Sequence, residues 1–317
     1  MDKQIMNTVK HYLQPNSLSE VFEMATVFEN EFRFIAGGTD LMVNRFQENE
    51  NSSTLIDING INELKEVKIT KDYLSIGALI ILDELKNYQE IANEYPVLIQ
   101  AANAVGSPVI RKTATLGGNI LCENRCIFYN QSKWWRDAVG NCLKCDGTIC
   151  IATGSKKHCY SEFVSDTAIA LISMDAMVEV VDKNGIQKRM LAEIYTGDGV
   201  KPVNLSKFNL IKSILLPLNE KFRSTFNKLR QRESMDFTSL TTCISVNKEG
   251  KINLVLGGVD PKPVIVTGNM ESQRDELINL ASKKSRAIDN EIFSRKYRKQ
   301  MIKVFLERSF DQMEIYK

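Results

Sequence analysis

Two similar glycine-pair segments organise this chain: AGGTDL at residues 36–41 and TLGGNI at residues 115–120. Glycine has no side chain and adopts positive φ at little cost, so the backbone N–H groups of such a turn can converge on an anion such as a pyrophosphate. Neither segment is G-x-G-x-x-G or G-x-x-x-x-G-K-[ST], so the fingerprints of nicotinamide-type Rossmann folds and P-loops are missing. The pair indicates either two purely structural turns or a shared ligand that carries phosphate.

The apolar pattern predicts a mixture of short strands and helices. Ser17 and Glu20 have the spacing of a capping box, which predicts a helix from there to about Phe28. Helical periodicity is also present over residues 84–104 and 166–176. Strands are predicted at residues 32–36, 53–58, 73–76, 177–182 and 210–216.

A second unit is predicted to begin near Asn219, with strands at residues 222–229, 241–246 and 252–257 followed by two helices. The last helix is predicted over residues 288–310, where spacing places five apolar side chains on one face: Ile288, Ile292, Tyr297, Met301 and Phe305. The basic residues 295–303 are expected on its solvated face. Without regular βαβ alternation, the fold class is α+β.

The overall composition describes an ordinary globular chain. Its 317 residues suggest about two domains, and 43% hydrophobic residues, 25% charged residues and a net charge of +2 exclude disordered, collagen-like and strongly cationic nucleic-acid-binding proteins. No apolar stretch reaches the length of a transmembrane helix. Residues 1–7 lack the apolar core of a secretory signal. We therefore expect a cytoplasmic protein with no membrane span.

Cysteines are concentrated in one segment, whereas the only histidines are His11 and His158. Two histidines argue against zincin, facial-triad and blue-copper sites. Six of the seven cysteines lie in residues 122–159, which indicates metal or cluster ligation more than disulfides in a reducing compartment. Spacing alone leaves three interpretations open: a [4Fe–4S] cluster, a zinc knuckle in which Cys122 and Cys126 join Cys142 and Cys145, or unligated thiols. The seventh cysteine, Cys243, lies in an apolar strand and is predicted to be a small buried hydrophobe.

The chain resembles the FAD-binding (medium) subunits of molybdenum hydroxylases, the family that includes xanthine dehydrogenase and aerobic carbon monoxide dehydrogenase. The resemblance covers almost the whole chain. The matching segments are YLQPNSL at 12–18, AGGTDL at 36–41, AVGSPVIR at 104–111, TLGGNI at 115–120, SDTA at 165–168 and KLRQR at 228–232.

The resemblance implies a two-lobed FAD-binding domain of vanillyl-alcohol-oxidase type over residues 1–218. A small α+β domain of the carbon monoxide dehydrogenase flavoprotein type would follow over residues 219–317. Both glycine turns would hold the FAD pyrophosphate. By resemblance, the residues that contact FAD are Phe34, Ile35, Ala36, Gly37, Gly38, Thr39, Asp40, Leu41, Val105, Thr115, Leu116, Gly117, Gly118, Asn119, Asp166, Ile211 and Lys228.

Within the family, the cysteine segment is most similar to that of the 4-hydroxybenzoyl-CoA reductase type. That type carries an insertion, here residues 122–160, which binds one [4Fe–4S] cluster through C-x15-C-x7-C-x8-C. Its ligands would be Cys126, Cys142, Cys150 and Cys159, which leaves Cys122 and Cys145 as surplus thiols. The chain departs from its relatives at Ile169, where proline is usual, and we expect only a local effect on the helix.

The resemblance further implies an oxidoreductase subunit that transfers electrons and has no catalytic residue of its own. Its partners would be a large subunit with the molybdenum cofactor, a small subunit with [2Fe–2S] clusters and an external carrier such as ferredoxin, assembled as a dimer of heterotrimers. Three alternatives remain: the FAD subunit of a xanthine, purine or N-heterocycle dehydrogenase, a free-standing FAD oxidoreductase, and a zinc-stabilised scaffold. The organic substrate stays open, because the pocket that selects it would lie in the molybdenum subunit.

Overall fold

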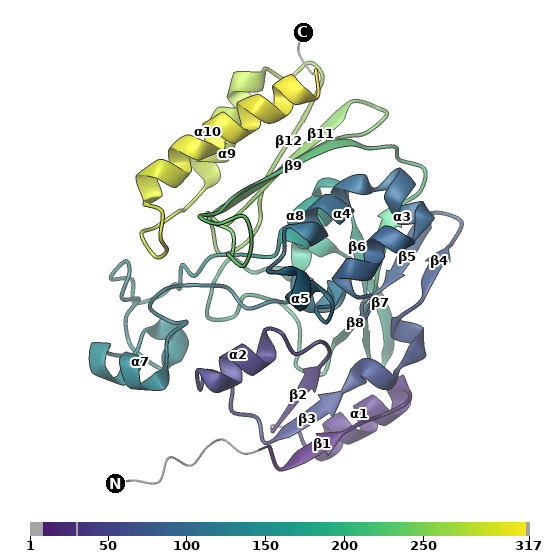
Figure 1. Cartoon of the computed structure of the whole chain (residues 1–317), viewed down its shortest axis with the longest axis vertical. Helices are drawn as coiled ribbons and strands as arrows, with labels where there is room; N and C mark the ends of the chain where they lie inside the picture. The colour runs from purple at the N-terminus through teal and green to yellow at the C-terminus, as the bar shows by residue number, and fades with distance from the viewer. Residues whose placement is uncertain (1–8, 30, 315–317) are drawn as a thin grey trace.

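The computed structural model describes residues 9–29 and 31–314. Three β-sheets and their covering helices follow one another from bottom to top in Figure 1, which is the mixed α+β arrangement expected from the sequence. The prediction about residues 1–7 falls outside the described residues. Among the helices of the described chain, none combines the length and the apolar character that a membrane crossing requires.

The N-terminal lobe is a three-stranded parallel sheet in the order β1-β3-β2, formed by β1 (His11–Leu13), β3 (Thr54–Asp57) and β2 (Phe32–Ile35). Helix α1 (Leu18–Val27) begins where the capping residues predict, because the Ser17 hydroxyl accepts from the Glu20 N–H at 3.3 Å. The Glu20 carboxylate in turn accepts from the N–H of Asn16 at 2.7 Å. Helix α2 (Leu41–Phe46) follows the first glycine turn.

The second lobe is a five-stranded antiparallel sheet whose order is β4-β5-β8-β6-β7. Its strands are β4 (Val67–Ile69), β5 (Tyr73–Gly77), β8 (Leu210–Pro217), β6 (Met177–Asp182) and β7 (Gly185–Met190). The single helix predicted over residues 84–104 is wrong. A 3₁₀ helix (Leu82–Asn87), α3 (Gln89–Glu94) and α4 (Pro96–Asn103) replace it, because Pro96 lacks an N–H and therefore starts a new helix.

The C-terminal part is a four-stranded antiparallel sheet, β12-β11-β10-β9, with α9 (Arg274–Lys284) and α10 (Arg295–Gln312) on one face. The strands are β9 (Arg223–Leu229), β10 (Leu240–Val246), β11 (Lys251–Gly257) and β12 (Val264–Asn269), of which β12 was not predicted. The predicted start of the last helix at residue 288 is also wrong, because Ser294 caps it. Its buried residues are Arg298, Ile302, Leu306, Ser309 and Phe310. Of the predicted face, Met301 and Phe305 pack partly buried against the same core, whereas Ile292 and Tyr297 are exposed.

Helix α8 (Asp166–Ser173) is the centre of the core, and all of its residues are buried. It packs against α4 and α6 (Leu116–Ile120) on one side and against β10 and β11 on the other. A Cβ atom on Gly257 of β11 would lie 3.0 Å from the Ile169 side chain, so this helix and the C-terminal sheet are in close contact. One helix therefore joins the FAD-type lobe to the C-terminal sheet.

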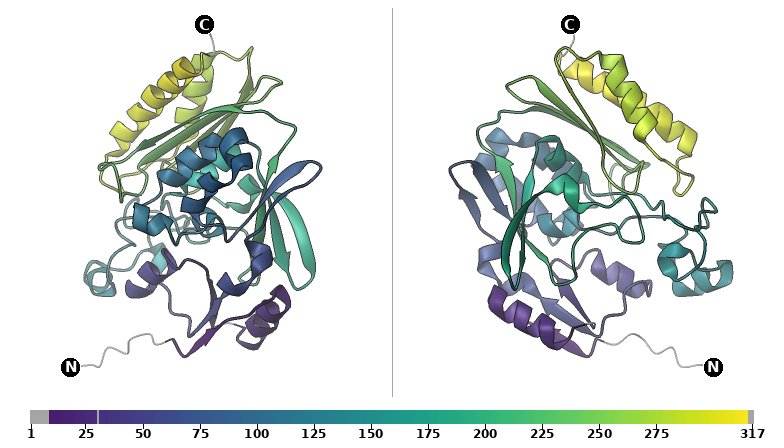
Figure 2. Two further views of the ribbon diagram at one scale, coloured as in Figure 1. Left: turned by 45° about the vertical axis from the view of Figure 1, so that its right-hand side comes forward. Right: turned by 180° about the vertical axis from the view of Figure 1, so that it is seen from behind.

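The remaining helices are short. They are α5 (Pro108–Arg111) before the second glycine turn and α7 (Lys133–Val139) in the cysteine segment. Figures 1 and 2 show the cysteine segment projecting from the body beside α2. Two hydrogen bonds to backbone carbonyls connect the cysteine segment to the N-terminal lobe. Arg136 donates to Gln47 O at 2.8 Å, and Asn49 donates to Tyr129 O at 3.4 Å.

Replacing Ile169 by alanine is expected to lower the free energy of unfolding by about 2–4 kcal/mol, because the side chain is fully buried where the sheets meet. Chemical denaturation followed by circular dichroism measures this loss. Ile186→Ala, at a side chain that is 50% exposed on β7, is the control and should change stability by about 0.5 kcal/mol or less. Equal losses for the two variants would contradict the central role of α8.

Candidate functional site

The two glycine turns, at Gly37-Gly38 and Gly117-Gly118, are about 80 residues apart in the sequence and lie against each other. A Cβ atom on Gly37 would fall 1.9 Å from the carbonyl oxygen of Thr113, just before the second turn, so only glycine allows this approach. In the first turn, Gly38 has a φ of +68°. In the second, Gly117 donates its N–H to Ala78 O at 2.8 Å, and a Cβ there would lie 2.7 Å from the Ala78 side chain. The structure therefore brings the two predicted turns together in one place.

Two polar side chains of the second turn make contacts within the protein. Thr115 is the N-cap of α6, and its hydroxyl accepts from the Gly118 N–H at 3.1 Å. The Asn119 side-chain oxygen accepts from the N–H of Thr167 at 3.3 Å and from its hydroxyl at 2.6 Å. These bonds fix the turn against the start of α8. Their predicted contacts with FAD stay predictions.

Asp166 and Lys228, which are predicted to contact FAD, form a buried ion pair at 2.6 Å. The Lys228 ammonium also donates to Ala104 O at 2.8 Å, and the Thr241 hydroxyl donates to Asp166 at 2.8 Å. Burial raises the pKa of the Asp166 carboxyl, and the neighbouring Lys228 opposes that shift. The pair thus joins α8, the end of α4 and β9 at the boundary of the two lobes with the C-terminal sheet.

The other predicted FAD contacts are buried or half-buried. Residues 34–41 are half-buried where β2 enters α2. Ile211 is buried in β8, and Val105 packs against the same core at the end of α4. Their roles in binding FAD stay predictions.

Arg125 is a residue of this region that the sequence analysis missed. Its guanidinium forms an ion pair with Asp40 of the first turn and lies 4.4 Å from the ring centroid of Phe237. Its Nη1 atom is buried and has no hydrogen-bond partner, so a donor is available beside the turns. Asp40 also accepts from the Glu123 N–H at 3.0 Å. No spacing signal could identify this pair, because its members are 85 residues apart.

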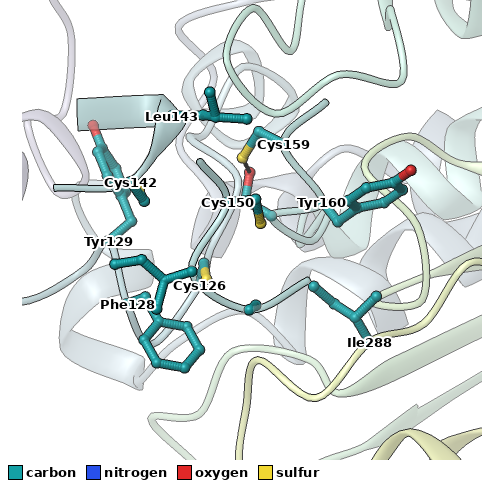
Figure 3. A pocket seen from close by; sticks show the side chains of 12 residues that line it. Cys126, Phe128, Tyr129, Cys142, Leu143, Cys150, Cys159, Tyr160 and Ile288 are labelled. Atoms are coloured by element: carbon teal, nitrogen blue, oxygen red, sulfur yellow. Dashed lines mark hydrogen bonds between the residues drawn. The ribbon is translucent and has the colours of Figure 1, made fainter. Parts of the chain in front are cut away.

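Four cysteines from separate stretches of the insertion line a single pocket: Cys126, Cys142, Cys150 and Cys159. They are the four that the resemblance predicts as ligands. Figure 3 shows them around one space, with apolar side chains such as Phe128, Leu143 and Ile288 completing the wall. Cys122 and Cys145 are outside the lining, so the group that the structure assembles differs from the zinc-knuckle set.

Two of the four pocket thiols have a raised pKa. Burial raises the pKa of Cys126 to about 11, with a smaller contribution from Cys159, Cys142 and Cys150, and burial also raises the pKa of Cys142. All seven cysteines are free thiols. Because metal ligands are thiolates, a raised pKa opposes iron binding at these two thiols.

The four thiols of the pocket bear on which metal group it could hold. Over residues 9–29 and 31–314, no three His, Cys, Asp or Glu side chains converge tightly enough to hold a single metal ion. The four cysteines nevertheless surround one pocket. Four thiols are the donor set that a [4Fe–4S] cluster uses, and the cluster itself stays a prediction. Cys243 is fully buried in β10 as predicted, and burial raises its pKa to about 12.

Comparison with known proteins places this geometry in a family. Residues 6–219 match the model of the FAD binding domain in molybdopterin dehydrogenase. The FAD-binding subunit of an aldehyde oxidoreductase of Escherichia coli is 31% identical over 241 residues, which cover 73% of this chain and 76% of that protein. The glyceraldehyde dehydrogenase medium chain of Sulfolobus acidocaldarius is 22% identical over 95% of this chain and 97% of its own length.

The same fold is found in solved structures. Carbon monoxide dehydrogenase from Oligotropha carboxidovorans superposes with a TM-score of 0.76 over 96% of both chains at 17% sequence identity. The expected FAD-binding fold is thereby confirmed. The chain therefore belongs to the family of FAD-binding domains of molybdopterin dehydrogenases, as the FAD-binding subunit of a molybdenum hydroxylase-type oxidoreductase.

Proposed function

We propose that this chain carries both FAD and one [4Fe–4S] cluster, as in the 4-hydroxybenzoyl-CoA reductase type, and passes electrons between an external carrier and the molybdenum subunits. The observation that carries the proposal is the single pocket lined by Cys126, Cys142, Cys150 and Cys159. When bound, FAD exchanges electrons singly or in pairs and the cluster exchanges them singly. The protein itself would bind and orient the FAD and the cluster and exclude water from their sites.

The FAD site is proposed at the junction of the two glycine turns. Backbone N–H groups of the turns would bind the pyrophosphate, and the free Nη1 of Arg125 adds a cation beside them. The seventeen residues predicted from the resemblance, from Phe34 to Lys228, are proposed as its contacts. Asp166 and Lys228 would act mainly by holding the lobes in register, since each is already paired.

The cluster site is proposed as a dry pocket near the surface. The cysteines and the apolar wall would exclude water, which is one factor that sets the potential of a cluster. Lys156 and Lys157 are exposed in the loop between Cys150 and Cys159. This basic loop is adjacent to two proposed ligands and suits an acidic one-electron carrier such as ferredoxin.

The remaining assembly follows the family resemblance. We propose domains at residues 1–218 and 219–317, with the family match that ends at residue 219 in support. We also propose a large molybdenum subunit and a small [2Fe–2S] subunit as partners, in a dimer of heterotrimers in the cytoplasm. A free-standing FAD oxidoreductase is the competing function, and it predicts substrate turnover by the isolated chain. A subunit predicts at most dye-linked electron transfer.

Anaerobically purified protein is expected to contain about four irons per chain. Cys150→Ser should lose most of this iron and its absorbance between 400 and 450 nm, because it removes a thiolate from the pocket. Cys145→Ser, outside the lining, is the matched control and should keep both. Iron, acid-labile sulfide and zinc are measured together. Zinc in place of iron, or equal losses in the two variants, would refute the cluster.

Gly37→Ala is expected to weaken FAD binding by about tenfold or more, since the new methyl group meets Thr113 O and forces the turns apart. Fluorescence titration of the flavin-free protein measures the dissociation constant. Gly140→Ala is a control in the insertion, where no atom lies within 4 Å of the added Cβ and the φ of +105° brings only backbone strain. Unchanged FAD affinity in Gly37→Ala would argue against the shared site.

Reversing two charges, Lys156→Glu together with Lys157→Glu, is expected to slow reduction by an acidic ferredoxin about tenfold at low salt. Stopped-flow absorbance measures this rate, and its salt dependence should flatten. The control reverses two exposed charges on the C-terminal helices, Lys283→Glu together with Lys296→Glu. If both double variants slow the reaction equally, the loop is not the docking point.

A further inference from the structure

One wall of the cysteine pocket comes from the C-terminal sheet domain. Ile288 lines the pocket together with the four cysteines, although it is 129 residues beyond the last of them. In Figure 3 its side chain faces the pocket from a chain segment separate from the insertion. We call residues 286–291, which precede α10, the wall segment. The sequence analysis assigned part of it to a helix, so its place at the pocket is a purely tertiary result.

The wall segment is hydrogen-bonded to both ends of the insertion through Asn290. The N–H of Ile127 donates to the Asn290 carbonyl at 3.0 Å. The Asn290 side chain donates to Tyr160 O at 3.2 Å. Because Ile127 follows Cys126 and Tyr160 follows Cys159, one fully buried asparagine spans the first and last proposed ligands.

Arg298 of α10 holds the wall segment in place. Its side chain is 0% exposed, and it contacts the carboxylate of Glu162 and the carbonyl of Ile288. The same guanidinium donates to Gly258 O at 2.7 Å and lies 3.1 Å from the Glu291 carboxylate. A buried guanidinium requires partners on every side, and its planar fork fixes their directions. The wall segment, Glu162 just after the insertion and the C-terminal sheet thus share one rigid cation.

The base of the insertion is fastened by the same neighbourhood. Arg125 and Glu162 pair through their backbones, with hydrogen bonds of 2.9 and 2.7 Å. Asn124 donates to Ser161 O at 3.0 Å and to Pro261 O at 2.8 Å. The first and last backbone segments of the insertion therefore lie side by side at its base. They contact the C-terminal domain as well as the FAD-binding lobe.

We propose that Asn290 and Arg298 are positioning residues for the cysteine pocket, through which the C-terminal domain controls the access of water to the bound cluster. The inference rests on the proposed function, because it concerns the environment of that cluster. With the wall closed, Ile288 keeps water from one side of the site. When the wall loosens, water enters and stabilises the more negative, reduced cluster, so its reduction potential becomes more positive.

The test compares three variants of the full chain, purified anaerobically: Asn290→Ala, Ile288→Ala and, as a control, Ile292→Ala, whose side chain is 69% exposed two residues further on. Asn290→Ala and Ile288→Ala are expected to release iron to a chelator about fivefold faster, since each removes a contact that resists local opening. Both should also shift the midpoint potential, followed by electron paramagnetic resonance, in the positive direction. The FAD content of all three variants should equal that of the wild type. Ile292→Ala should also keep the wild-type iron-release rate and midpoint potential.

Arg298→Lys extends the test to the cation, because it keeps the charge and loses the fork. It should release iron faster than the wild type. If it does not fold, the test depends on Asn290→Ala and Ile288→Ala. The inference is wrong if the wild type contains the cluster but Asn290→Ala and Ile288→Ala keep its midpoint potential and iron-release rate. That result would leave the proposal of the cluster unaffected. A wild-type protein without iron would overturn both proposals.

Discussion

The close approach of Gly37 to the Thr113 carbonyl is the contact on which the arrangement of the site depends. A side chain at residue 37 would fall 1.9 Å from that oxygen, so the N-terminal lobe and the five-stranded lobe can meet here only through glycine. The contact brings together two turns that lie far apart in the chain. It also places Asp40, at the end of the first turn, where Arg125 of the cysteine segment reaches it. The polar contacts of the site, such as the Arg125–Asp40 ion pair, therefore depend on the close backbone packing at Gly37.

Helix α8 transmits this arrangement to the rest of the molecule. Its N-terminal end receives Asn119 from the second turn, and Asp166 in its first turn binds Lys228 of β9. Burying such a pair is costly unless both charges are fully partnered, and Thr241 and Ala104 O complete the set. The site of the FAD-binding subunit and the C-terminal sheet are therefore parts of one packed body, with the helix as their common element.

The insertion adds a cysteine-lined pocket to the edge of this body. Its cysteines come from loops with little regular structure, so the pocket depends on contacts at the base of the insertion and along the wall segment. These contacts involve backbone carbonyls and a buried guanidinium rather than a hydrophobic core of its own. A small loop-rich segment of this kind commonly requires a metal centre to complete its folding. We propose that the four cysteines bind such a centre and that the neighbouring domain holds the segment in place.

The family resemblance, and not the spacing, singled out the four cysteines that line one pocket. The sequence by itself determined the local features: the capped start of α1, the glycine turns, most strands and the α+β class. These follow from short-range rules, namely capping, φ preferences, alternation and motif spacing. Only the tertiary structure decided that Arg298 lies on the buried face of α10, and that Arg125 and Ile288 join the sites. The reason is physical: partners 85 or more residues apart leave no periodic trace, and a buried arginine looks like a solvated one until its carbonyl and carboxylate partners are in place.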